Sequence, residues 1–137
     1  MKDFLVPILT FVAGLFGGLL PHVQRPLTDY RKTLTDISQL MLCSAQIMFG
    51  NGDIAEAEGF YNDIRKLHAR LMSSADSIPR SARRILQLLG LLRPRDQIEL
   101  GARTLIGISN QVISVKKDTA HLTTLIQQLG KALDITV

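Results

Sequence analysis

Three histidines and one cysteine are the residues of this sequence best suited to metal binding or nucleophilic chemistry. Asp118 and His121 lie one helical turn apart and could together supply two ligands to a metal ion. A di-metal site in a helical bundle needs such a motif twice, with two further carboxylates, and the sequence has no second copy. We therefore predict neither a metal site nor a cofactor.

The sequence also lacks the pairing that activates a nucleophile. Cys43 lies in a stretch with helical periodicity, where a thiol usually packs as a small apolar side chain. An activated thiol needs a base beside it, and the sequence identifies none. No phosphate-binding loop of the Gly-x-x-x-x-Gly-Lys type occurs. The sequence thus predicts a protein that is not an enzyme and has no catalytic residues.

A basic, amphipathic segment at residues 80–95 is the first candidate binding surface. It predicts a short helix over residues 81–92, with the phosphate or lipid contacts Arg80, Arg83, Arg84, Arg93 and Arg95. Three interpretations fit: a helix on an anionic membrane surface, a site for nucleotide or RNA phosphate, and an ordinary connector. No aromatic residue stands among these arginines, which disfavours stacking against single-stranded nucleic acid.

A second candidate is a group of polar residues within the most apolar of the predicted bundle helices. Arg103, Ser109 and Asn110 could form a buried polar network that fixes helix register, or they could face a ligand. Gly101 and Gly107 in the same helix would allow another helix to approach closely.

Length and composition limit what these residues can belong to. The chain has 137 residues, of which 46% are hydrophobic and 20% charged, which suits one folded domain and excludes a disordered chain. A single cysteine excludes a disulfide-stapled secreted domain. The net charge of +4 equals that of residues 80–103, which hold six arginines and two acidic residues. Residues 80–103 therefore account for the excess charge of the chain.

Residues 4–20 predict a transmembrane helix. They include no charged residue, and eleven of the seventeen are Leu, Ile, Val or Phe. As a helix they span roughly 25 Å, and an extension to Val23 reaches roughly the 30 Å of a hydrocarbon core. A cleaved signal peptide and a buried core helix are the alternatives. No small-x-small cleavage site follows the segment, whereas its length is near the lower limit for spanning.

Flanking cations predict the orientation of this helix. Lys2 precedes it, whereas Arg25, Arg31 and Lys32 follow, and cations concentrate on the cytoplasmic side of a membrane. We therefore expect a bacterial inner-membrane protein with its N-terminus outside and its C-terminus in the cytoplasm. Residues 1–24 form the predicted anchor and residues 25–137 a cytoplasmic domain.

Small residues recur at helical spacing within the predicted span. Ala13 and Gly17, and Gly14 and Gly18, are each four residues apart and share one helix face. In lipid such a strip allows two helices to pack closely. A single span has no second helix in its own chain, so the strip predicts a homo-oligomer in the bilayer.

The remaining residues predict an all-α fold. Apolar residues recur at steps of three and four over 27–48, 57–78, 98–113 and 122–133, with 98–113 the most buried. Pro21 and Pro26 predict a break before the first of these helices, and Asp53, Asp96 and Asp118 predict helix starts. The fold class is thus one N-terminal transmembrane helix followed by an up-and-down bundle of about four long helices and one short one.

The segment Leu105-Ile-Gly-Ile-Ser-Asn110, after a single N-terminal span and a proline-containing link, resembles a family of small uncharacterised bacterial membrane proteins. More remotely, the layout is similar to the membrane accessory protein of type VI-B CRISPR systems. That resemblance implies a HEPN-type helical domain and subunits assembled around a pore. HEPN nucleases separate an Arg from a His by four to six residues, whereas only two separate Arg65 from His68. The resemblance therefore implies only the layout of an anchor helix followed by a helical domain, and not nuclease activity.

These observations predict a non-enzymatic single-pass protein that self-associates through its transmembrane helix. Several anchors packed in a ring could perturb or perforate the membrane, as an antiphage defence effector would. The alternative is a membrane-tethered module that binds RNA, a nucleotide or a protein partner on the cytoplasmic side through residues 80–95.

Overall fold

The computed structural model describes residues 2–50, 53–114 and 116–137, with side chains from residue 5 to 10 and from 22 onward within those ranges. It is built from helices, and the described residues include no strand, so the predicted all-α class is confirmed. The helices are α1 (Lys2–Cys43), α2 (Ala45–Phe49), α3 (Ile54–Asp76), α4 (Arg80–Leu88), α5 (Arg95–Ile113) and α6 (Thr119–Leu133).

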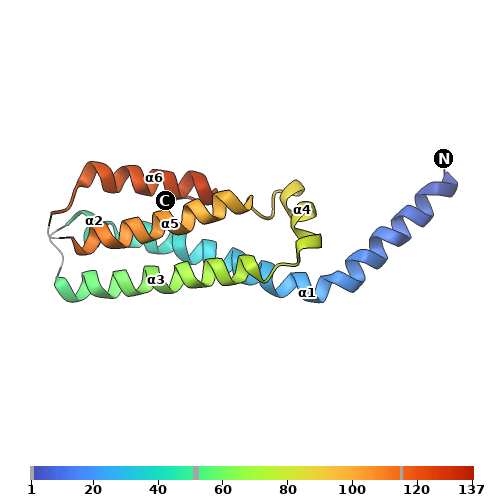
Figure 1. Cartoon of the computed structure of the whole chain (residues 1–137), viewed down its shortest axis with the longest axis horizontal. Coiled ribbons are helices and arrows are strands. Elements are labelled where there is room, and N and C mark those ends of the chain that lie inside the picture. Colours follow the sequence, from blue (N-terminus) through green and yellow to red (C-terminus); the bar gives the residue numbers. More distant parts are fainter. Residues whose placement is uncertain (1, 51–52, 115) are drawn as a thin grey trace.

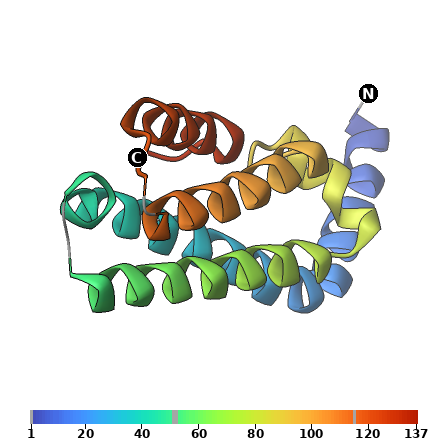
Figure 2. The same ribbon diagram turned by 60° about the vertical axis from the view of Figure 1, so that its left-hand side comes forward.

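Four long helices form the bundle (Figure 1). The C-terminal part of α1 packs against α3, α3 against α5, and α5 against α6. Consecutive long helices run antiparallel, as the colours along the chain show in Figures 1 and 2, and α4 lies in the connection between α3 and α5. The predicted up-and-down bundle is therefore confirmed, with α2 as a short helix that the periodicity had joined to the end of the preceding helix.

The core lies around α5. Eight of its residues are buried, more than in any other helix among the described side chains, which confirms the prediction for residues 98–113. Leu105 and Ile108 are 0% exposed. They belong to one hydrophobic cluster with residues of α1, α3 and α6, among them Ile37, Ile64 and Leu129. Burial of this shared stripe is the main stabilising contribution to the bundle.

A glycine sets how closely α5 and α6 approach. A Cβ atom built on Gly101 would lie 2.5 Å from Cδ2 of Leu133, a separation that real side chains do not reach. Gly107 has more room, since a Cβ there would lie 3.4 Å from Cδ1 of Leu125. The prediction that glycines allow close packing is thus confirmed at Gly101.

Two of the three predicted helix starts are confirmed. The carboxylate of Asp118 accepts a hydrogen bond from the His121 amide at 3.1 Å, and that of Asp53 accepts one from the Ala55 amide. The prediction for Asp96 was wrong, because α5 begins at Arg95 directly after Pro94. The fixed φ of proline suits the start of a helix, and Asp96 instead places its charge in the first turn, where the helix dipole favours it.

The predicted end of the basic helix was also wrong. Helix α4 ends at Leu88 rather than Leu92, because Gly90 adopts a left-handed backbone with φ of 71°. The amide of Leu91 then donates to the Leu86 carbonyl at 2.9 Å, a closure typical of a helix C-terminus.

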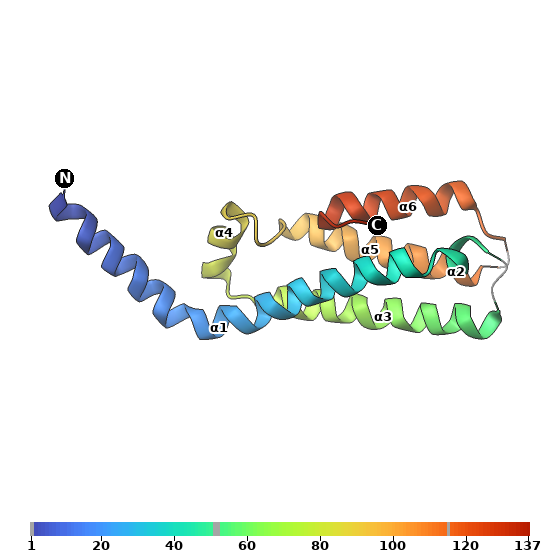
Figure 3. The same ribbon diagram turned by 180° about the vertical axis from the view of Figure 1, so that it is seen from behind.

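The prediction that the helix breaks at Pro21 and Pro26 was also wrong. Helix α1 continues through both prolines from Lys2 to Cys43. A proline inside a helix removes one backbone hydrogen bond and bends the helix without having to end it. Figures 1 and 3 show the result: α1 bends where it leaves the bundle, and its N-terminal part projects away from the other helices.

Within the residues whose side chains are described, no helix has a stretch that is long and apolar enough to cross a membrane. Most of the predicted span, including residues 11–20, lies outside those residues.

Candidate functional site at the end of the bundle

Helix α4 lies across the end of the bundle from which α1 departs (Figures 1 and 3). It follows Pro79, which with Ile78 terminates α3 and turns the chain. Ala82 and Leu86 are buried and hold α4 against the bundle. This end of the molecule also contains all five arginines that the sequence singled out, so their individual contacts decide what the surface can bind.

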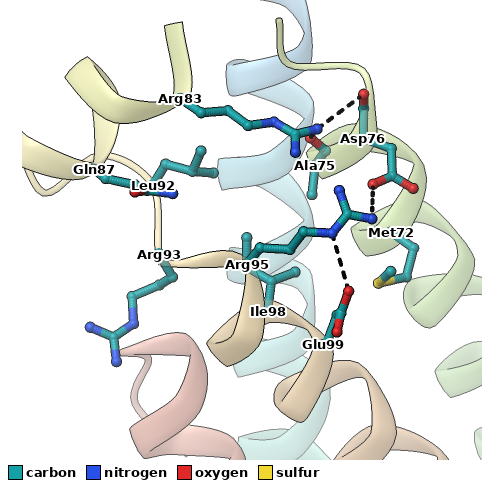
Figure 4. Close-up of a pocket in the computed structure, with 10 residues that line it drawn as sticks. All are labelled: Met72, Ala75, Asp76, Arg83, Gln87, Leu92, Arg93, Arg95, Ile98 and Glu99. Atoms are coloured by element: carbon teal, nitrogen blue, oxygen red, sulfur yellow. Dashed lines mark hydrogen bonds and ion pairs between the residues drawn. The ribbon is translucent and has the colours of Figure 1, made fainter. Parts of the chain in front are cut away.

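Arg83 stabilises the C-terminus of α3. Its guanidinium donates to the carbonyl oxygens of Ile78 at 3.1 Å, Ala75 at 3.2 Å and Asp76 at 3.4 Å. The last carbonyls of a helix have no partner within it and carry the negative end of its dipole. Arg83 therefore completes a helix end, and Figure 4 shows its guanidinium turned toward that end.

Arg93 makes the equivalent contact with α6. It donates through Nε to the Ala132 carbonyl at 3.0 Å and through Nη2 to the Lys131 carbonyl at 3.1 Å. These two carbonyls are nearly forty residues away in sequence, so local periodicity carries no signal of the contact.

Arg95 is held by two carboxylates. Its Nη2 lies 3.1 Å from Oδ1 of Asp76, and its Nε donates to Oε1 of Glu99 at 3.1 Å. The cavity between these side chains has a volume of only about 20 Å³, with Arg83 and Leu92 among its lining residues (Figure 4). That is room for one water molecule and for no nucleotide.

The five predicted contact residues therefore separate into two groups. Arg83, Arg93 and Arg95 bind groups of this chain. Arg80 and Arg84 are exposed, and within the described residues neither makes a hydrogen bond or ion pair. Of the five arginines, only Arg80 and Arg84 are therefore available to contact a partner.

Exchanging Arg83 for alanine should destabilise the bundle, whereas exchanging Arg84 should not. Arg83→Ala removes three hydrogen bonds at and just after the end of α3, although the Ala75 carbonyl keeps the Ile78 amide as a donor, and we expect a loss of about 1–2 kcal/mol in the free energy of unfolding. For Arg84→Ala we expect a change within about 0.5 kcal/mol, as for other exposed positions. Chemical unfolding of the purified chain, followed by circular dichroism, measures both. Equal losses would contradict the assigned role of Arg83.

The second candidate group, the polar residues of α5, does not come together in the structure. Arg103 and Asn110 are exposed, whereas Ser109 is buried and donates to the Ile106 carbonyl of its own helix at 2.7 Å. Residues 103 and 110 are seven positions apart and share the outer face of α5, while residue 109 points to the core. The structure thus does not bring these three side chains together into a polar network or a ligand site.

The residues considered for metal binding and catalysis are also apart. No group of three or more His, Cys, Asp or Glu side chains that could hold a metal ion occurs in the described part of the chain. Asp118 instead caps α6. Cys43 is exposed at the end of α1, so the expectation that it packs inside the bundle was wrong.

Tyr30 is a buried polar group that the sequence did not identify, because its helical position marked it only as apolar. The residue is 1% exposed, and its hydroxyl has no hydrogen-bond partner in the described structure. Burial raises the pKa of Tyr30, an effect that the proximity of Arg93 offsets in part. Tyr30 belongs to the hydrophobic cluster of the bundle, so it acts as a core residue.

A polar groove between α1 and α3 is the other feature that sequence patterns did not reveal. It has a volume of about 640 Å³ and is lined by Arg25, Asp29, Arg70, Ser73 and neighbouring residues. Arg70, one of the lining residues, forms an ion pair with Asp36 of α1 at 3.0 Å. The groove is open to solvent, and this ion pair links α1 to α3 beside it.

The residues predicted for oligomerisation lie outside the described side chains. Ala13, Gly14, Gly17 and Gly18 belong to the helical backbone of α1, and the structure adds nothing on their contacts. Next to them, Leu5, Val6, Ile8 and Leu9 are described and are between 55% and 66% exposed. The projecting part of α1 thus presents large apolar side chains without cover from its own chain.

Comparison with known proteins provides no further assignment: no protein-family model, curated protein or solved structure matches the chain.

Proposed function

We propose that this chain is a non-enzymatic, single-pass protein of the bacterial inner membrane that self-associates through the projecting part of α1. The bundle would lie on the cytoplasmic side, as the excess of cations after residue 24 indicates. The proposal joins three features: an apolar helical segment, a strip of small residues within it, and a bundle with a complete core of its own.

The exposed apolar side chains of the projecting segment carry this proposal. Leu5, Val6, Ile8 and Leu9 lie within little more than one turn of α1 and are all exposed, and the uncharged sequence continues to Leu20. A helix that is apolar on all sides is stable only when it is surrounded by protein or by lipid. The bundle does not cover this segment, because α1 leads it away from the other helices (Figures 1 and 3). Lipid is the environment that its composition fits.

Self-association follows from the sequence of the segment. In a bilayer the hydrophobic effect does not bring helices together, so association depends on close packing at small residues. Gly14 and Gly18, with Ala13 and Gly17, provide such a strip. A closed ring of these helices could perturb or perforate the membrane, which is the activity we propose for the assembly as an antiphage effector.

Binding of RNA or a nucleotide through residues 80–95 has less support. Three of the five arginines in that segment already bind carbonyl or carboxylate groups of the bundle. Phosphate binding of useful affinity depends on several cations, and the two that remain provide a small contribution. A protein partner on the cytoplasmic side would need another surface.

The mass of the detergent-solubilised chain tests the proposal. We expect the wild type to be extracted from membranes by detergent and not by alkaline carbonate, and to run as an oligomer in light-scattering chromatography. Gly14→Leu/Gly18→Leu should remain in the membrane and become monomeric. Gly59→Leu is the matched control, because Gly59 is exposed in α3 with no atom near its Cβ position.

Each part of the proposal has its own contradicting result. A monomeric wild type would contradict self-association and the pore with it. Release by carbonate would contradict the anchor. An oligomer that causes no dye release from vesicles would limit the function to membrane attachment and assembly.

A further inference from the structure

We infer that α4 is a second membrane-contacting element, whose outer face lies on the anionic surface of the bilayer into which α1 inserts. This inference rests on the proposed function for the position of the membrane. The outer face consists of Ile85, Leu88 and Leu89 together with Arg80 and Arg84. The partner is a lipid surface with negatively charged head groups.

The apolar part of this face is unusually exposed. Leu88 is 88% exposed, Leu89 59% and Ile85 44%, and no described large hydrophobic residue is more exposed than Leu88. Residues 88 and 89 lie three and four positions after residue 85, which places all three on one side of the helix. Ala82 and Leu86, on the other side, are buried. Helix α4 therefore has one face for the bundle and one that the chain leaves uncovered.

The cations of α4 fit the same orientation. Arg84 lies one turn before Leu88, so its side chain borders the apolar face, and Arg80 lies one turn before Arg84. Both are exposed, in contrast to Arg83, whose guanidinium turns inward to the α3 carbonyls. Apolar side chains bordered by arginines are typical of helices that lie in the membrane interface, where the guanidinium groups reach the lipid phosphates.

The position of α4 in the fold indicates that lipid is what covers its outer face. Helix α4 crosses the end of the bundle from which the apolar part of α1 projects (Figures 1 and 3). Insertion of that part therefore brings this end of the bundle, and not the opposite end, to the head groups. Exposed apolar residues occur at the opposite end too, as at Ile54, but Glu56 follows there instead of an arginine. That end carries acidic residues as well as Lys116 and Lys117, so its charge does not favour an anionic surface as two exposed arginines do.

Single-cysteine probes on the full chain test the inference. In a Cys43→Ser background, Leu9→Cys, Leu88→Cys and Ile54→Cys each carry a small fluorophore. The chain is reconstituted in vesicles of phosphatidylcholine with an equal part of phosphatidylglycerol. Lipids with a nitroxide near the head group quench a probe at the membrane, and iodide quenches one in water. We expect lipid quenching at residues 9 and 88 and iodide quenching at residue 54.

Two further measurements separate the charged from the apolar contribution. Arg80→Gln/Arg84→Gln should shift the equilibrium between docked and undocked α4 about thirtyfold toward the undocked form, seen as iodide quenching at residue 88. Vesicles of phosphatidylcholine alone should have the same effect on the unchanged chain. Arg103→Gln, an exposed arginine of α5, is the matched control and should leave the quenching at residue 88 unchanged.

The outcomes distinguish this inference from the proposed function. Lipid quenching at residue 9 with iodide quenching at residue 88 would overturn the inference and leave the anchor intact. Iodide quenching at residue 9 would overturn the anchor itself. Equal lipid quenching at residues 54 and 88 would also overturn the inference, because the contact would then not depend on α4.

Discussion

The double substitution Ile8→Arg/Leu9→Arg is expected to move the protein from the membrane fraction to the aqueous fraction. Both residues lie in the projecting part of α1, where they are 57% and 61% exposed, so the new side chains meet no packed neighbour in the bundle. An arginine costs about 3 kcal/mol of insertion free energy at the centre of a transmembrane helix, so two arginines at the fifth and sixth positions of the proposed span cost up to about 6 kcal/mol. The modest hydrophobicity of a seventeen-residue span, with its three glycines and one proline, does not offset that cost.

The matched control carries the same added charge elsewhere. Leu42→Arg/Ile54→Arg replaces two exposed apolar residues of α1 and α3, 56% and 77% exposed, at the opposite end of the bundle. We expect this variant to stay in the membrane fraction after ultracentrifugation of cell lysates. If the Ile8→Arg/Leu9→Arg protein also stays there, the N-terminal segment does not anchor the chain.

The exchange Leu105→Ala should cause a large loss of bundle stability. Leu105 is 0% exposed in the helix that packs against both α3 and α6. Truncation removes its buried methyl groups and leaves a cavity that close-packed neighbours only partly fill, at a cost of about 2–5 kcal/mol. For a domain of this size that is a large part of the whole free energy of unfolding.

Leu88→Ala makes the same chemical change at a residue that is 88% exposed. In detergent we expect it to change the free energy of unfolding by less than about 0.5 kcal/mol. Urea titration of the solubilised chain, followed by the helical circular dichroism signal, compares the two. Similar midpoints for Leu105→Ala and the wild type would contradict the central place of α5 in the core.

Periodicity was sufficient to predict the bundle, because each long helix buries one stripe whose spacing is visible in the sequence. Ile37 in α1, Ile64 in α3 and Leu122 in α6 are all buried at positions that the stripes predicted. Capping chemistry placed the starts of α3 and α6, since an aspartate acts on amides only a few residues away. These are local relationships, which a sequence records directly.

The contacts of the arginines could not be predicted in the same way. Arg93 binds carbonyls at the end of α6, and Arg95 binds Asp76 at the end of α3. Which cation meets which helix end depends on tertiary packing, and five arginines in one basic segment look alike in sequence. The course of α1 through its prolines could not be predicted for a related reason. A proline in the sequence is compatible with a bend in a helix or with the end of a helix, and the packing on either side decides between the two.

The uninterrupted course of α1 has a mechanical consequence for the assembly that we propose. Tyr30 and Ile37 in the core and Leu9 outside it belong to one continuous bent rod, in which Pro21 and Pro26 remove backbone hydrogen bonds without ending the helix. A tilt or rotation of the rod in the bilayer is therefore transmitted to the bundle as a whole. Neighbouring subunits would hold their bundles at a fixed orientation, so a stimulus that turns one bundle would change how the rods pack within the membrane.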